Sequence, residues 1–154
     1  MMVKSLSMPQ LDISISYNSW LEQEPQEGWQ NFFESILSLI KVQSEEISLS
    51  LVDDSTIQKL NSQFRGKDSP TNVLAFPSTT PEICLGDIVL SFETIQNEAI
   101  AQGKIFLNHV THLFVHGLLH LMGYDHVEED ERAKMEEKEI QILEKLGIGN
   151  PYVS

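Results

Sequence analysis

The spacing of apolar and polar residues predicts four β-strands. Side chains on a strand point alternately to its two faces, so a strand with one buried face alternates between apolar and polar residues. Such alternation, or a short apolar run bordered by turn residues, covers Leu11–Tyr17, Ile47–Val52, Thr71–Pro77 and Ile83–Ser91. We expect the third strand to stop at Pro77, because proline has no N–H group to donate to a neighbouring strand.

Apolar residues spaced three or four apart predict five helices. These helices cover Gly28–Val42, Asp53–Phe64, Phe92–Gln102, Ile105–Met122 and Glu129–Leu146. In the second helix we expect Ile57, Leu60 and Phe64 to face inward. Strands and helices are mixed along the chain, and the longest helices come late. This order favours an α+β fold, with one mixed sheet of about four strands packed with helices.

The helix predicted over Ile105–Met122 is central to the interpretation. At about 100° per residue, His109, His112, His116 and His120 fall on one narrow stripe. Apolar residues cover most of the remaining circumference, which is typical of a buried helix. The polar stripe therefore needs partners or a cavity to face, because a buried polar group without a partner is costly.

Composition and charge narrow the class of protein. The 154 residues, 41% of them hydrophobic and 21% charged, fit one globular domain. No apolar run reaches the roughly 20 residues that span a bilayer, and the first residues lack a signal peptide's apolar core, so we expect a cytoplasmic protein. The formal charge of −13 excludes a grip on nucleic acid by bulk electrostatics. Many acidic residues cluster in residues 127–147, which we interpret as the solvated face of the last helix.

The motif HGLLHLMGYDH has the spacing of a metal site. His116 and His120 lie four residues apart, so on a helix their imidazoles point the same way and could bind one ion. Gly123 can turn the chain back through a left-handed conformation, which returns His126 towards the first pair. Three nitrogen donors with an open fourth position are typical of a catalytic zinc site. A structural zinc, closed by Cys84 or Asp125, and hydrogen-bonded core histidines are the alternatives.

The same spacing matches the metzincin protease signature except at one position. Gly117 stands where that signature has the glutamate that acts as general base, so peptide hydrolysis is disfavoured. Three neutral imidazoles leave the two positive charges of zinc uncompensated, which attracts anions and lowers the pKa of bound water to about 7. A phosphodiester is a natural substrate for such a site, although the charge argument also admits carboxylates.

Several other polar residues are candidates for the site. Arg65, in the turn-rich segment RGKDSP beside Lys67, could bind a phosphate through paired hydrogen bonds, or it is an ordinary exposed arginine. His112 lies one turn before the first predicted ligand. It could donate a hydrogen bond to a group that supports the metal ligands, it could move a proton, or it could be a hydrogen-bonded core residue. Asp87 and Asp125 could each orient the ring of a ligand histidine, or serve a turn or strand end.

Taken together, the motifs RGKDSPTNVLAFP, LGDIVLS and HGLLHLMGYDH resemble the bacterial YbeY family of rRNA maturation factors, over roughly residues 47–152. The resemblance implies an α+β fold whose central helix carries the first two zinc ligands. It implies a single-strand-specific endoribonuclease acting in 16S rRNA 3′-end maturation and ribosome quality control. By position, the ligands would be His116, His120 and His126, and the RNA-handling arginine would be Arg65. The family often has Asp where Asn72 stands.

We therefore expect residues 1–154 to form a single metal-dependent hydrolase domain with one Zn²⁺ ion. The expected partners are rRNA in the small ribosomal subunit, with ribosomal proteins or an assembly GTPase as further candidates, and neither DNA nor a membrane. The nucleophile is either metal-activated water or a ribose 2′-OH. Two rival hypotheses are a ribosome-assembly binding factor with a structural metal and, less favoured, a metalloprotease.

Overall fold

The structure is a computed structural model that describes residues 8–124 and 128–153. Within these residues the predicted strands are confirmed as β1 (Gln10–Ile15), β2 (Glu46–Val52), β3 (Val73–Pro77) and β4 (Cys84–Ser91). The predicted helices are confirmed as α2 (Trp29–Leu37), α3 (Asp54–Arg65), α4 (Phe92–Gln102), α5 (Phe106–Leu121) and α6 (Glu129–Lys145). A further short helix that the pattern did not predict, α1 (Ser19–Glu22), precedes α2.

The four strands form one mixed sheet, as predicted, and their order in the sheet is β1-β2-β4-β3. β1 pairs with β2 in parallel, and β2 pairs with β4 in parallel. β3 runs antiparallel to β4 and forms one edge of the sheet. β4 is rich in apolar residues because helices cover both of its faces. β2 instead alternates between buried apolar residues and half-buried serines, since the main core covers one of its faces.

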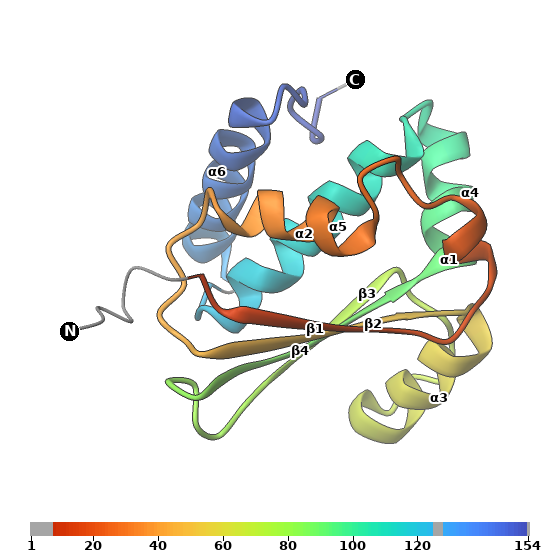
Figure 1. The fold of residues 1–154 in the computed structure, drawn as a ribbon, viewed down its shortest axis with the longest axis horizontal. Helices are drawn as coiled ribbons and strands as arrows, with labels where there is room; N and C mark the ends of the chain where they lie inside the picture. Colours follow the sequence, from red (N-terminus) through yellow and green to blue (C-terminus); the bar gives the residue numbers. More distant parts are fainter. Residues whose placement is uncertain (1–7, 125–127, 154) are drawn as a thin grey trace.

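Helices cover the two faces of the sheet unequally (Figure 1). α3 lies on one face, over a small core of Val52, Ile57, Leu74 and Val89. The opposite face carries the main core, to which α2, α4, α5 and α6 contribute. Side chains of β4 alternate accordingly, since Ile88 and Leu90 belong to the main core and Val89 to the small one.

One predicted core residue is wrong. Phe64 is 61% exposed, whereas Ile57 on the same helix is fully buried. The ring of Phe64 lies against the ring of Phe76, at a centroid distance of 5.4 Å. Because Phe76 belongs to the edge strand β3, no further strand is available to cover the end of α3.

Hydrogen bonds fix the start of α3 against the start of α4. Asp53 caps α3, since its carboxylate accepts from the backbone N–H of Thr56 at 2.9 Å. The next residue, Asp54, accepts from the hydroxyls of Ser91 at 2.6 Å and Thr94 at 2.7 Å. The two helices on opposite sides of the sheet are thereby held at one end of β2 and β4.

α5 runs through the main core, as its apolar circumference predicted, and eleven of its residues are buried. It ends at Leu121, and Gly123 turns the chain just beyond the helix, as predicted, with a φ of +103° that favours glycine. The N–H groups of Gly123 and Tyr124 donate to the carbonyls of His120 and Leu119, both at 3.1 Å, which closes the helix end. No helix in the described part of the chain combines the length and apolar character needed to cross a bilayer.

Candidate functional site

The histidines of α5 reach two different surroundings. His109 and His112, in the first half of the helix, are buried and have carboxylate partners. His116 and His120, in the second half, are half-buried and line one hollow on the surface. The single polar stripe that the sequence predicted is therefore divided into a buried part and an accessible part.

The hollow brings together most of the predicted site within the described residues. Arg65 and Lys67 line it from the end of α3 and the segment that follows. Asn72 lines it from the start of β3, and His116 and His120 line it from α5. Two imidazoles and two cationic side chains thus face one space on an acidic protein, which makes it suited to an anion.

Gly117 lets α5 approach the sheet closely beside this hollow. A Cβ atom at position 117 would lie 3.2 Å from Cγ2 of Ile88 and 3.3 Å from Cγ2 of Val73. At these distances the ends of the two side chains must shift by a few tenths of an ångström to admit even a Cβ atom. The residue that interrupts the metzincin signature therefore packs closely against β3 and β4, and it also lines the hollow beside His116.

Arg65 is the last residue of α3 and does not lie in the loop where the sequence placed it. Its guanidinium donates to the carbonyl oxygen of Ala75 at 3.4 Å, while the side chain remains exposed. The following segment is held to the helix because the amide of Asn61 donates to the carbonyl of Ser69 at 2.9 Å. Arg65 is therefore directed across the hollow from a position fixed by α3 and β3.

A buried carboxylate that the sequence did not single out lies directly behind His116. Glu139 of α6 is fully buried, and its Oε2 lies 3.1 Å from Nδ1 of His116. Its Oε1 lies 2.7 Å from Nε2 of His112 and accepts the hydroxyl of Tyr152, also at 2.7 Å. Burial alone would raise the pKa of Glu139, but these three hydrogen bonds lower it to about 2.

The charge of Glu139 determines which nitrogen of His116 carries the proton. An ionised carboxylate only accepts hydrogen bonds, so Nδ1 of His116 must donate to it. The lone pair of the neutral ring is then on Nε2. A carboxylate bound to the far nitrogen of a histidine is the arrangement that orients imidazole ligands in metal sites. The donor types at His116 and His120 therefore fit a zinc ion.

The remaining predicted site residues are placed differently. Asp87 is exposed and shares the β4 face of Val89, opposite α5, so it does not reach the histidines. Glu139 orients His116 in the way that was predicted for Asp87. Cys84 begins β4 and is not among the residues that line the hollow. Asp125 and His126 lie outside the described residues, so the third predicted ligand and its neighbour stay predictions.

The position of Glu139 in the sequence already pointed to burial, although the acidic residues of this helix were interpreted as its solvated face. It follows Met135 by four residues and precedes Ile142 by three, so all three share one stripe of α6. All three are buried. A charged residue at a position where the helix pattern predicts a core residue indicates a buried partner, and here the partners are histidines of α5.

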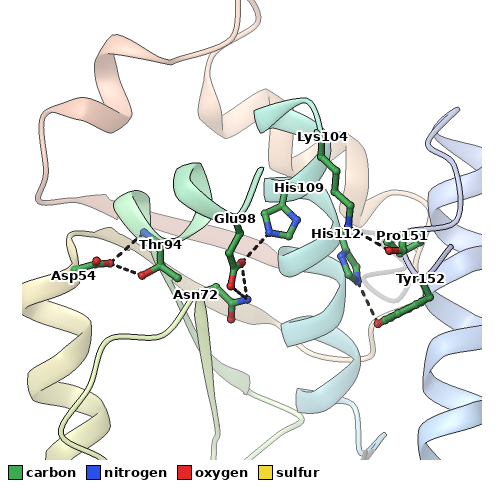
Figure 2. A network of polar contacts seen from close by, with 9 residues as sticks. All are labelled: Asp54, Asn72, Thr94, Glu98, Lys104, His109, His112, Pro151 and Tyr152. Carbon is green, nitrogen blue, oxygen red and sulfur yellow. Dashed lines mark hydrogen bonds and ion pairs between the residues drawn. The ribbon is translucent and has the colours of Figure 1, made fainter. Parts of the chain in front are cut away.

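A second carboxylate–histidine pair, formed by the buried His109 and the half-buried Glu98, lies at the other end of α5. Glu98 of α4 lies 2.9 Å from Nε2 of His109 and also accepts the amide of Asn72 at 3.0 Å (Figure 2). Burial lowers the pKa of His109, and Glu98 only partly opposes this effect. Asn72 thus donates to a carboxylate, which an aspartate at this position could not do while ionised.

Comparison with protein families gives one match that covers most of the chain. The family model described as "Endoribonuclease YbeY" matches residues 12–147. These residues include every described element from β2 to α6.

Individual proteins are similar over comparable lengths. The protein named Endoribonuclease YbeY of Sinorhizobium medicae is 40% identical, with 94% of this chain and 96% of that protein covered. Its namesake in Bartonella bacilliformis is 49% identical, with 75% of this chain and 77% of that protein covered. Among solved structures, the solution structure of a Thermotoga maritima protein is similar, with a TM-score of 0.60 and 26% sequence identity. The matched region covers 94% of this chain and 100% of the Thermotoga maritima chain.

Proposed function

Because the chain belongs to the YbeY family, we propose that it is a single-strand-specific, zinc-dependent endoribonuclease. It acts in the cytoplasm on the small ribosomal subunit, where it matures the 3′ end of 16S rRNA and takes part in ribosome quality control. The whole chain, residues 1–154, works as one metal-dependent hydrolase domain. The name Endoribonuclease, carried by the family and by its relatives, supports the activity.

The observation that carries the proposal is the hollow that Arg65 lines together with His116 and His120. A phosphodiester is an anion with a planar set of acceptors that a guanidinium matches with paired hydrogen bonds. On a chain with a formal charge of −13, such a local cationic site is the place where RNA can bind. An exposed arginine fixed by the carbonyl of Ala75 is suited to hold the phosphate beside the histidines.

His116, His120 and His126 would hold the zinc ion in this proposal, the last of them outside the described residues. The buried carboxylate of Glu139 keeps the proton of His116 on Nδ1, which leaves a nitrogen lone pair for the metal. When bound, zinc supplies positive charge for the phosphate and lowers the pKa of water to about 7. Arg65 stabilises the negative charge that develops on the phosphate oxygens during cleavage.

Single-turnover cleavage tests the activity. Purified, zinc-loaded protein free of other nucleases is mixed with an RNA that carries the 16S 3′ precursor, and the same RNA paired with a complementary strand is the control. We expect cleavage of the single strand by wild type and none by His120→Ala. Products ending in a 2′,3′-cyclic phosphate would identify the ribose 2′-OH as nucleophile. Products ending in a free 3′-hydroxyl, with the phosphate on the 5′ end of the downstream fragment, would identify water.

A second candidate is a ribosome-assembly binding factor whose metal is structural. The acidic surface favours it, because such a surface suits protein partners, such as ribosomal proteins or an assembly GTPase, better than bare RNA. If wild type never cuts the RNA with zinc bound but is retained on small subunits, this second function replaces the first. The tight packing of Gly117 argues against the metalloprotease.

A further inference from the structure

The segment after α6 brings a tyrosine to the carboxylate behind the site. Tyr152 donates its hydroxyl to Oε1 of Glu139 at 2.7 Å, and His112 lies 2.7 Å from the same oxygen. The other oxygen of Glu139 faces His116 at 3.1 Å. Two donors on one oxygen resist rotation of the carboxylate, and the second oxygen is therefore kept in the direction of His116.

Contacts along this segment hold the tyrosine in place. Lys104, in the turn between α4 and α5, donates its ammonium to the carbonyl of Pro151 at 3.2 Å (Figure 2). The side chain of Asn150 accepts the backbone N–H of Tyr152 at 2.8 Å, a local turn that directs the residue. The ring of Tyr152 stands edge-on to His112 at a centroid distance of 5.5 Å.

We propose that Tyr152 is a positioning residue for His116, which acts by fixing the carboxylate of Glu139. The proposal rests on the proposed function in one respect, namely that His116 is a zinc ligand. Tyr152 does not line the hollow with Arg65. Its hydroxyl lies 2.7 Å from Oε1 of Glu139 and 3.3 Å from Nε2 of His112, so we expect its effect on the site to pass mainly through Glu139.

The chemistry of the hydroxyl agrees with this role. Burial and the hydrogen bond to Glu139 both raise the pKa of Tyr152 above its ordinary value. The hydroxyl therefore stays protonated and donates throughout the pH range in which the protein works. Tyr152 and Glu139 also line one surface hollow together with His116, in which the tyrosine is exposed and the carboxylate is buried.

Removal of the hydroxyl alone separates positioning from packing. Tyr152 is 44% exposed, so Tyr152→Phe keeps the edge-on contact of its ring with His112 and removes only the hydroxyl. That hydroxyl donates to Glu139 at 2.7 Å and also lies 3.3 Å from Nε2 of His112. The matched control is Val153→Ala, since Val153 is the next residue and is 66% exposed. Lys104→Gln is a second variant, because it weakens the anchor of the segment without touching the tyrosine or the carboxylate.

Two measurements on these purified full-length proteins test the proposal. The first is the zinc Kd from competition with a chromogenic chelator. The second is the nitrogen-15 spectrum of the His116 ring in metal-free protein, which reports whether Nδ1 or Nε2 carries the proton. Substitutions in the groups that orient ligand histidines typically lower metal affinity by about 10–100-fold. Tyr152 bonds to such a group and not to the histidine itself, so for Tyr152→Phe we expect zinc binding to weaken by about 3–10-fold.

The expected pattern is specific. Tyr152→Phe weakens zinc binding and moves part of the His116 population away from the Nδ1–H form. Lys104→Gln changes the zinc Kd and the His116 spectrum in the same direction, but to a smaller extent. Val153→Ala changes neither the Kd nor the spectrum. An unchanged Kd and an unchanged His116 spectrum in folded Tyr152→Phe would overturn the proposal. Absence of RNA cleavage by wild type would instead refute the proposed function, and both readouts would still decide the role of Tyr152.

Discussion

The ring of His116 on α5 and the buried carboxylate of Glu139 on α6 lie 3.1 Å apart. This contact links the two longest helices of the described chain at the edge of the hollow with Arg65. It also gives His116 a fixed orientation and a fixed tautomer before any ligand is bound. The site is therefore organised from its buried side, by a residue that does not reach the substrate.

Replacing this carboxylate should weaken the metal site. In Glu139→Gln the neutral amide is a poorer acceptor and cannot satisfy three donors as the carboxylate does. We expect zinc affinity to fall by about 10–100-fold, the range known for groups that orient ligand histidines. Chelator competition measures it, with Glu137→Gln, an exposed neighbour on α6, as the control for the lost charge. Equal affinities for the two variants would show that Glu139 does not orient His116.

The same carboxylate should make the metal-free protein sensitive to acid. The pKa of Glu139 is about 2 in the folded state, against an ordinary value of 4.5. A lowered pKa means that the charged form stabilises the fold above about pH 4.5 and that this stabilisation is lost as the pH falls towards 2. The shift corresponds to a contribution on the order of 3 kcal/mol at neutral pH.

Urea unfolding of wild type and Glu139→Gln at a series of pH values, with a chelator present, measures this contribution. The difference in free energy of unfolding between the two proteins should be largest at neutral pH and shrink below about pH 4.5. A difference that stays constant down to pH 3 would mean that Glu139 does not titrate as the hydrogen bonds from His112, His116 and Tyr152 require.

Restoring the protease signature should damage the fold and create no protease. Gly117→Glu adds a long charged side chain whose first carbon atom presses against Ile88 and Val73. We expect a loss of about 1–3 kcal/mol in stability, since the added atoms overpack the contact between α5 and the sheet. Thermal unfolding measures it, with Gly117→Ala as the mild control because only side-chain ends need to move. A stable Gly117→Glu that cleaves peptides would contradict the account.

Much of this architecture follows from local patterns. The alternation in β1 and β2, the helical spacing in α2 and α4 and the glycine after α5 each predict their own structure, because burial on one face repeats with the period of the element. Phe64 was predicted wrongly for a reason outside α3, namely that the neighbouring strand is at the edge of the sheet. The helix pattern does not show where the sheet ends.

The site residues on α5 could be predicted from the sequence, whereas most of their partners on other segments could not. His116 and His120 share a face because four residues separate them, and the structure places both in the hollow. The partners of such a face come from distant parts of the chain, and the spacing on α5 does not identify them. Glu139 could have been suspected from its core position on α6, but Tyr152 follows the last helix and has no periodic signal.

Arg65 should matter for cleavage and not for the metal. We expect Arg65→Ala to lower single-turnover cleavage about 10–100-fold, because it removes a charged donor from the phosphate in the transition state. Zinc content and the unfolding midpoint should stay close to wild type, since the side chain is exposed and makes one long bond to Ala75. Arg65→Lys should recover part of the rate, because lysine keeps the charge but not the paired geometry. Loss of zinc in Arg65→Ala would assign the residue a structural role.

The most direct test of the account is the zinc content of the purified protein beside that of His120→Ala, measured by atomic spectroscopy after dialysis. His120 lines the hollow with His116 and Arg65, and it contributes an imidazole that no neighbouring side chain of α5 can replace. We predict close to one zinc ion per chain for wild type and almost none for His120→Ala, with both proteins folded. Full zinc content in folded His120→Ala would contradict the claim that these histidines form the metal site.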